Sequence, residues 1–297
     1  MNTTTAMVTT VRSCAVGPEL WERIFSFEDY GELLALVWPS IIAGALLAVM
    51  GGVVGVMVMT RDMGFAVHGI AELSFAGASI ALLLGYDVVT GSMVGSIMAA
   101  LIMGLLGSGA RERNAITGVM MPFGLGLGIL ALALYQGRSA NKFGLLTGQI
   151  VAVDDSRLPS IAIGTFIVLA LLALMWRPLM FASTDPWVAR ARGVPVAGLS
   201  TAFMIVLGVA VALSIHVVGA LLVLALLITP AAAAMRLTAS PGKVVVLSVI
   251  FAEVSLVGGI LLSLAGSLPV SPYITTISFV IWLIARAVGS RTMAWKQ

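Results

Sequence analysis

The feature that most constrains this chain is a series of continuous apolar segments, each about as long as a lipid bilayer is thick. A helix rises about 1.5 Å per residue, so about 20 apolar residues cross the roughly 30 Å hydrocarbon layer. The segment 33–59 and several later segments reach this length with few or no charged side chains. A transmembrane β-barrel would instead show segments of about ten residues in which apolar and polar positions alternate. The sequence therefore predicts an all-α protein, a polytopic integral membrane helical bundle.

Composition supports this fold class and excludes several functions. Of the 297 residues, 60% are hydrophobic and only 10% are charged, whereas a soluble domain is about a quarter charged. The single cysteine, Cys14, rules out an intrachain disulfide and a cysteine-based metal cluster. The chain has no G-x-x-x-x-G-K-[ST] loop for nucleotide hydrolysis and no basic stripe for nucleic acid. An enzyme and a nucleic-acid-binding protein are both disfavoured.

We expect about nine transmembrane helices, all within a membrane domain at residues 33–289. Residues 1–32 form an N-terminal tail, for which a short interfacial helix and a frayed polar segment are both consistent with the sequence. A turn near His216 divides the sixth and seventh spans, because a single helix over 196–235 would be about 60 Å long. The predicted spans are 33–59, 64–84, 88–106, 116–135, 158–181, 196–215, 217–235, 243–265 and 273–289.

The placement of basic residues predicts the orientation of these spans. Of the 16 Lys and Arg residues, 11 fall in segments on the same side as the C-terminus and 5 on the other side. Because cytoplasmic segments carry the excess of Lys and Arg, the N-terminus is expected outside and the C-terminus inside. Residues 290–297 are then a cytoplasmic tail. Glycine pairs four residues apart, such as Gly91/Gly95 and Gly124/Gly128, indicate close packing between helices.

Three ionisable residues lie deep in the predicted spans: His68, Glu72 and Glu253. A charge at this depth costs at least about 2.5 kcal/mol, so each of these residues is a candidate functional group. The i, i+4 spacing puts His68 and Glu72 on one helix face, and imidazole nitrogen with carboxylate oxygen suits Zn²⁺, Mn²⁺ or Fe²⁺. A His68–Glu72 hydrogen bond that staples this span to a neighbouring helix is an equally open interpretation, and a proton relay is a third. Glu253 is either a further ligand or a partner for another helix.

Four stretches, taken in order, resemble a known family. They read TRDMGFAVHGIAELSFAGASIALLLG, FGLLTGQIVAVDDSRL, DPWVARARGVPV and VGALLVLALLITPAAAAMRL. Over about residues 27–286, the chain resembles the membrane permease subunits of bacterial ABC importers for zinc and manganese. In that family the first stretch carries an Asp and a His four residues apart that face the ion path. His68 and Glu72 occupy these positions with the order inverted, and Glu253 matches no family position that we can name.

The resemblance also implies a mechanism and partners. Asp185, Pro186, Ala189 and Gly193 match a cytoplasmic D-P-x-x-A-x-x-x-G-V segment, which implies a coupling helix at 185–194 that docks on a separate ATP-binding cassette ATPase. ATP would be bound and hydrolysed on that subunit. A homodimer of permeases in the bacterial plasma membrane would receive the ion from an extracytoplasmic metal-binding protein. No permanently bound cofactor is implied.

Sequence and resemblance together predict the permease subunit of a divalent-metal ABC importer, with zinc as the first choice of ion and manganese as the second. Two alternatives stay open. In one, a proton-coupled secondary transporter uses His68, Glu72 and Glu253 as a relay. In the other, a permease of the same architecture carries a metal chelate.

Overall fold

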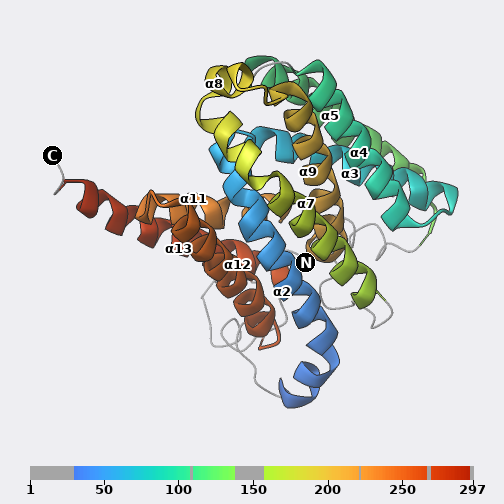
Figure 1. The fold of residues 1–297 in the computed structure, drawn as a ribbon. Coiled ribbons are helices and arrows are strands. Elements are labelled where there is room, and N and C mark those ends of the chain that lie inside the picture. Colours follow the sequence, from blue (N-terminus) through green and yellow to red (C-terminus); the bar gives the residue numbers. More distant parts are fainter. Residues whose placement is uncertain (1–29, 108–109, 138–156, 221, 266–268, 295–297) are drawn as a thin grey trace, which may run out of the picture.

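The computed structural model describes residues 30–107, 110–137, 157–220, 222–265 and 269–294, and all regular secondary structure within them is helical (Figure 1). The expected N-terminal interfacial helix and most of the second family-like stretch lie outside the described residues. The helices are α2 (Tyr30–Thr60), α3 (Gly64–Leu84), α4 (Val88–Leu106), α5 (Ala110–Leu134), α7 (Leu158–Thr184), α8 (Pro186–Ala191), α9 (Val196–Val218), α10 (Val223–Leu227), α11 (Thr229–Leu237), α12 (Pro241–Ser263) and α13 (Val270–Ala294).

The predicted fold class is confirmed. Eight helices of the described chain are long and apolar enough to cross a membrane, and they correspond to eight of the nine predicted spans. The seventh predicted span differs from the others. The chain turns at Gly219, which has a φ of 86°, a little after the predicted turn near His216, and continues as two short helices, α10 and α11. At 1.5 Å per residue, Val223–Leu237 reaches only about 22 Å.

The break between α10 and α11 has a local cause. Pro230 stands in the first turn of α11, where its missing N–H costs nothing, but it cannot continue the helix that precedes it. Close packing also places α10 against α2. A Cβ on Gly55 of α2 would overlap the carbonyl oxygen of Leu227. The short α10–α11 segment is therefore pressed directly onto the backbone of α2.

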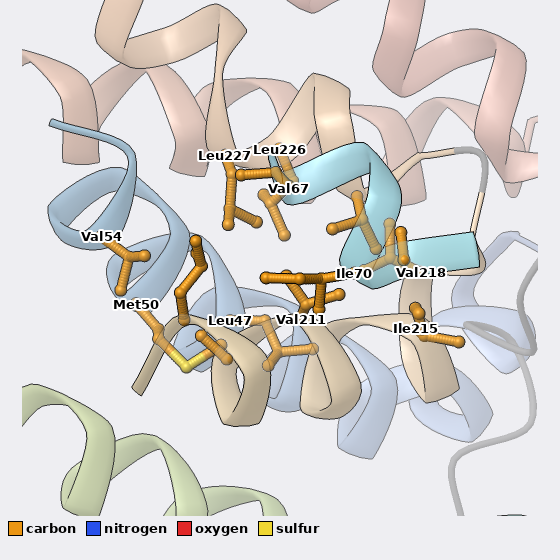
Figure 2. Close-up of a cluster of buried hydrophobic side chains, with 14 of the residues drawn as sticks. Leu47, Met50, Val54, Val67, Ile70, Val211, Ile215, Val218, Leu226 and Leu227 are labelled. Atoms are coloured by element: carbon orange, nitrogen blue, oxygen red, sulfur yellow. The ribbon is translucent and has the colours of Figure 1, made fainter. Parts of the chain in front are cut away.

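One continuous apolar core joins α2, α3, α9 and α10 (Figure 2). The helix α3 contributes Val67 and Ile70, both fully buried, to the space between these elements. The core residues labelled in Figure 2 are Leu47, Met50, Val54, Val67, Ile70, Val211, Ile215, Val218, Leu226 and Leu227. This packing fixes which face of α3 points inward and leaves its neighbouring face for the ionisable residues.

Two stripes of glycine press α4 and α5 against α3, as the glycine spacing indicated. A Cβ on Gly91 of α4 would overlap the carbonyl oxygen of Gly77, and one on Gly95 would overlap that of Leu73. On α5, a Cβ at Gly124 would lie 2.7 Å from the side chain of Leu73. Because these contacts involve backbone atoms, α3 lies in a close-packed unit with α4 and α5.

A short connection joins α3 to α4 and sets where α4 begins. Gly85 ends α3 in the left-handed conformation, with a φ of 77°. Asp87 then caps α4, because its carboxylate accepts a hydrogen bond of 2.9 Å from the backbone N–H of Thr90. That hydrogen bond is the main reason why the pKa of Asp87 lies below its usual value.

Candidate functional site

His68 and Glu72 lie one turn apart on α3, as their spacing predicts. The Nε2 atom of His68 and the Oε1 atom of Glu72 are 3.8 Å apart, which is too long for a hydrogen bond. The side chain of His68 is 29% exposed and that of Glu72 is 9% exposed. Since α3 begins at Gly64, Glu72 lies about 12 Å along the helix. The structure therefore brings an imidazole and a carboxylate together inside a membrane helix.

Neither side chain is tied to a neighbouring helix within the described residues. The Nδ1 atom of His68 is buried and has no hydrogen-bond partner in that part of the chain. The backbone at Glu72 is held more firmly, because a Cβ at Gly124 of α5 would lie 3.1 Å from its carbonyl carbon. The position of the pair is thus fixed by helix packing, while the facing nitrogen and oxygen atoms keep their bonding capacity.

Glu253 does not join this pair within one chain. It is half-buried on α12, a helix that packs mainly against α2, α11 and α13. Among the described residues, no group of three or more His, Cys, Asp or Glu side chains is placed to hold a metal ion. The role of Glu253 as a ligand stays a prediction. His216 lies in the last turn of α9, just before the turn at Gly219.

A cavity of about 550 Å³ lies between α3, α4 and α5, but it is not lined by His68 or Glu72. Its walls are almost entirely apolar, with residues such as Ile80 and Phe123, and Asp87 is its acidic residue. A divalent cation needs several oxygen, nitrogen or sulfur ligands, which this lining does not provide. The chemistry for an ion lies at the His68–Glu72 face of α3.

The segment that resembles a coupling helix does fold as a short helix, α8, between α7 and α9. The Oδ1 atom of Asp185 accepts hydrogen bonds of 3.0 Å from two backbone N–H groups in its first turn. Pro186 opens the helix, Ala189 is fully buried, and Gly193 ends the segment with a φ of 82°. Each of the four matched residues thus has a structural reason for its place in the motif.

The exposed side of α8 offers an aromatic and a basic group. The side chain of Trp187 is 77% exposed, and the guanidinium carbon of Arg190 lies 5.6 Å from the centre of its ring. A large aromatic side chain with this much exposed surface is typical of residues that anchor protein–protein contacts. The geometry of α8 is therefore that of a small preformed projection between two long helices.

Sequence reasoning missed a polar junction beside α8. The Arg61 guanidinium donates hydrogen bonds to Ser183 Oγ at 2.9 Å and to Ser200 Oγ at 3.2 Å. It also lies 5.8 Å from the ring centre of the buried Phe203. The sequence showed Arg61 only as one of the basic residues outside the spans, because its partners are 122 and 139 positions away.

Comparisons with known proteins decide the family. The model of the ABC 3 transport family matches residues 34–289 of this chain. The chain belongs to this family. It is 28% identical over 226 residues to the manganese transport system membrane protein MntC of Halalkalibacterium halodurans, covering 75% of this chain and 77% of that protein.

Two further matches agree with this assignment. The high-affinity zinc uptake system membrane protein ZnuB of Haemophilus influenzae is 26% identical over 232 residues, covering 78% of this chain and 89% of that protein. Among solved structures, PsaBC from Streptococcus pneumoniae in complex with Fab matches with a TM-score of 0.77 at 24% identity. This match covers 86% of the chain and 94% of the solved chain, and it shows that the two share a fold.

Proposed function

We propose that this chain is the membrane permease subunit of an ATP-driven importer for divalent metal ions, with zinc as the first choice and manganese as the second. Its membership of the ABC 3 transport family supports the transport role. The choice of ions follows from two relatives, one named for manganese transport and the other for zinc uptake. In this reading, ATP hydrolysis belongs to a separate ATPase subunit.

The observation that carries the ion path is the 3.8 Å separation between His68 Nε2 and Glu72 Oε1. Bonds from Zn²⁺ to imidazole nitrogen and carboxylate oxygen are about 2.0–2.2 Å long, so two ligands of a tetrahedral ion lie about 3.4 Å apart. The observed separation is about 0.4 Å wider, so a small change of side-chain rotamer would bring the two atoms to the spacing of ligands. A direct hydrogen bond would need the two atoms to lie within about 3.2 Å.

The same site favours passage over permanent binding. A structural zinc site is closed by four protein ligands, whereas one copy of this chain supplies two at His68 and Glu72. Stable sites also fix the second ring nitrogen of a histidine through a hydrogen bond. The Nδ1 atom of His68 has no such partner in the described chain. We propose that two copies of the chain form a homodimer whose paired sites hold the ion briefly.

The position of α8 supports the assignment of the partner subunits. The placement of Lys and Arg predicts that the C-terminus is inside, and α8 would then lie on the cytoplasmic side, where Trp187 and Arg190 would meet the ATPase. An extracytoplasmic metal-binding protein would deliver the ion at the opposite face. A multi-pass chain of this kind is expected in the bacterial plasma membrane.

The decisive experiment measures ⁶⁵Zn²⁺ and ⁵⁴Mn²⁺ uptake into vesicles that contain the chain with its ATPase. We expect the double variant His68→Ala/Glu72→Ala to lose uptake while ATP hydrolysis continues. Glu253→Gln is measured separately, because the ligand role of this half-buried acid stays a prediction, and a loss of uptake in this variant would add Glu253 to the path. Full uptake by the double variant would refute the ion path.

Two further conditions of the same assay separate the alternatives. Uptake driven by a proton gradient with an inactive ATPase would support a secondary transporter. Uptake of a metal chelate that free Zn²⁺ does not compete with would indicate a chelate permease. For the proposed importer, we expect uptake to require ATP hydrolysis and free Zn²⁺ to compete with Mn²⁺.

A further inference from the structure

Arg61 connects three elements that are far apart in the sequence. It lies in the short loop between α2 and α3, and its two terminal nitrogens donate hydrogen bonds to Ser183 near the end of α7 and to Ser200 near the start of α9. These two serines lie on either side of α8. One guanidinium is therefore hydrogen-bonded to both helices that flank α8.

The bonds around Arg61 leave little freedom. The hydroxyl of Ser183 accepts from Arg61 and donates its own hydrogen to the Leu179 carbonyl at 2.6 Å. Phe203, which is fully buried, covers the guanidinium from one side. Hydrogen bonds from a charged donor are stronger and more directional than neutral ones. A shift of α7 or α9 must therefore either carry Arg61 with it or break these bonds.

The loop that carries Arg61 is also firmly attached to α3. Only three residues separate the end of α2 from the start of α3, and Asp62 among them has a φ of 52°. The next residue, Met63, is 1% exposed, and its backbone N–H donates to the Val58 carbonyl at 2.9 Å. Its carbonyl in turn accepts from the N–H of Val67 in α3. His68, the next residue, is one of the two residues of the proposed ion path.

A second arginine and an acid also act on this junction through their charges. Arg113 of α5 is 6% exposed, and its Nε atom has no hydrogen-bond partner in the described chain. Burial, followed by the nearby charge of Arg113, lowers the pKa of Arg61. Asp62, in the same loop as Arg61, carries an opposite charge that acts on Arg113 and offsets part of this repulsion.

We propose that Arg61 is a positioning residue that transmits the movement of α8 to the helix carrying His68 and Glu72. The inference rests on the proposed function, since it requires an ATPase that moves α8. The proposed path runs from α8 through Ser183 and Ser200 to the Arg61 guanidinium, and from there through the α2–α3 loop to α3. Arg61 does not touch the ion in this scheme.

The test uses the complete complex with its ATPase in vesicles and records ATP hydrolysis, Zn²⁺ uptake and thermal stability for each variant. We expect Arg61→Met to keep ATP hydrolysis but to transport about tenfold fewer ions per ATP, within the usual range for coupling between two sites. Arg61→Lys, which keeps the charge but not the two-pronged geometry, should show a smaller loss. Ser183→Ala/Ser200→Ala should lower the ratio in the same direction.

The control is Arg111→Met, which removes an exposed arginine at the start of α5 and should leave the ratio of ions to ATP unchanged. If Arg61→Met keeps the wild-type ratio, or lowers hydrolysis, uptake and stability in parallel, the transmission role is overturned and Arg61 is purely structural. If wild-type vesicles hydrolyse ATP but take up no metal, the proposed function fails instead. The two failures are therefore distinguishable.

Discussion

Two glycines of α5, one packed against α3 and one not, test whether close packing fixes the position of α3. Gly124 and Gly126 both lie in α5, two residues apart. A Cβ at Gly124 would lie 2.7 Å from the Leu73 side chain and 3.1 Å from the Glu72 carbonyl carbon. A Cβ at Gly126 would meet nothing within 4 Å. Substituting each glycine by alanine adds one methyl group in two different surroundings.

The expected magnitudes follow from two opposing effects. Alanine favours a helix over glycine by about 0.8–1.0 kcal/mol, and both variants gain this amount. Only Gly124→Ala adds the cost of overpacking, about 1–3 kcal/mol. The difference between the variants therefore isolates the packing cost. With a melting temperature that moves about 2–4 °C per kcal/mol, Gly124→Ala should melt about 2–12 °C below Gly126→Ala.

The assay is thermal unfolding of the isolated chain in detergent, followed by circular dichroism at identical protein and detergent concentrations. Zn²⁺ binding to each variant adds a second measurement. We expect Gly124→Ala to bind more weakly, because the backbone that carries Glu72 must shift, and Gly126→Ala to bind as the wild type does. Equal melting temperatures for the two variants would refute the packing argument for α3.

Two more predictions concern helix starts. The cap at Asp87 should make the stability of the fold depend on pH. The folded chain holds the pKa of this carboxyl below its usual value of about 3.9. The ionised cap therefore stabilises the fold above about pH 3.9, and this stabilisation is lost as the pH falls through the pKa of the folded chain. Asp87→Asn should therefore melt with a weaker dependence on pH below about pH 4, and an unchanged dependence would contradict this account. Asp185→Ala removes the cap of α8 at a cost of about 1 kcal/mol. We expect weaker association with the ATPase in a pull-down titration, whereas unaltered association would show that α8 does not depend on its cap.

Much of the fold follows from the sequence because the bilayer imposes one length and one polarity on every span. The segment 158–181, for example, is found as α7 (Leu158–Thr184) almost where it was predicted. The exception, α10–α11, has the apolar composition of a span but is shorter, since Pro230 starts a new helix and Gly55 lets α10 approach α2. Hydropathy does not report such contacts between helices.

The candidate site was predictable only where it is local. The i, i+4 spacing of His68 and Glu72 determines their common face, and the structure places them together. The relation of Glu253 to this pair depends on how α12 packs, which the spacing within one helix does not determine. The role of Arg61 depends on serines more than 120 positions away. No pattern within the α2–α3 loop identifies them.

The glycine contacts between α3, α4 and α5 have a consequence for how the protein can move. Side chains can change rotamer to accommodate sliding, but backbone against backbone has no such freedom, so α3 cannot rotate independently of α4 and α5. We expect these helices to move as one rigid unit. The α4–α9 contact extends this unit, because a Cβ at Gly208 of α9 would lie 3.1 Å from the Ser96 carbonyl oxygen, and Thr201 Oγ1 donates a hydrogen bond to the Gly104 carbonyl. Movement would then take place where Val67 and Ile70 of α3 meet side chains of α2 and α10 (Figure 2).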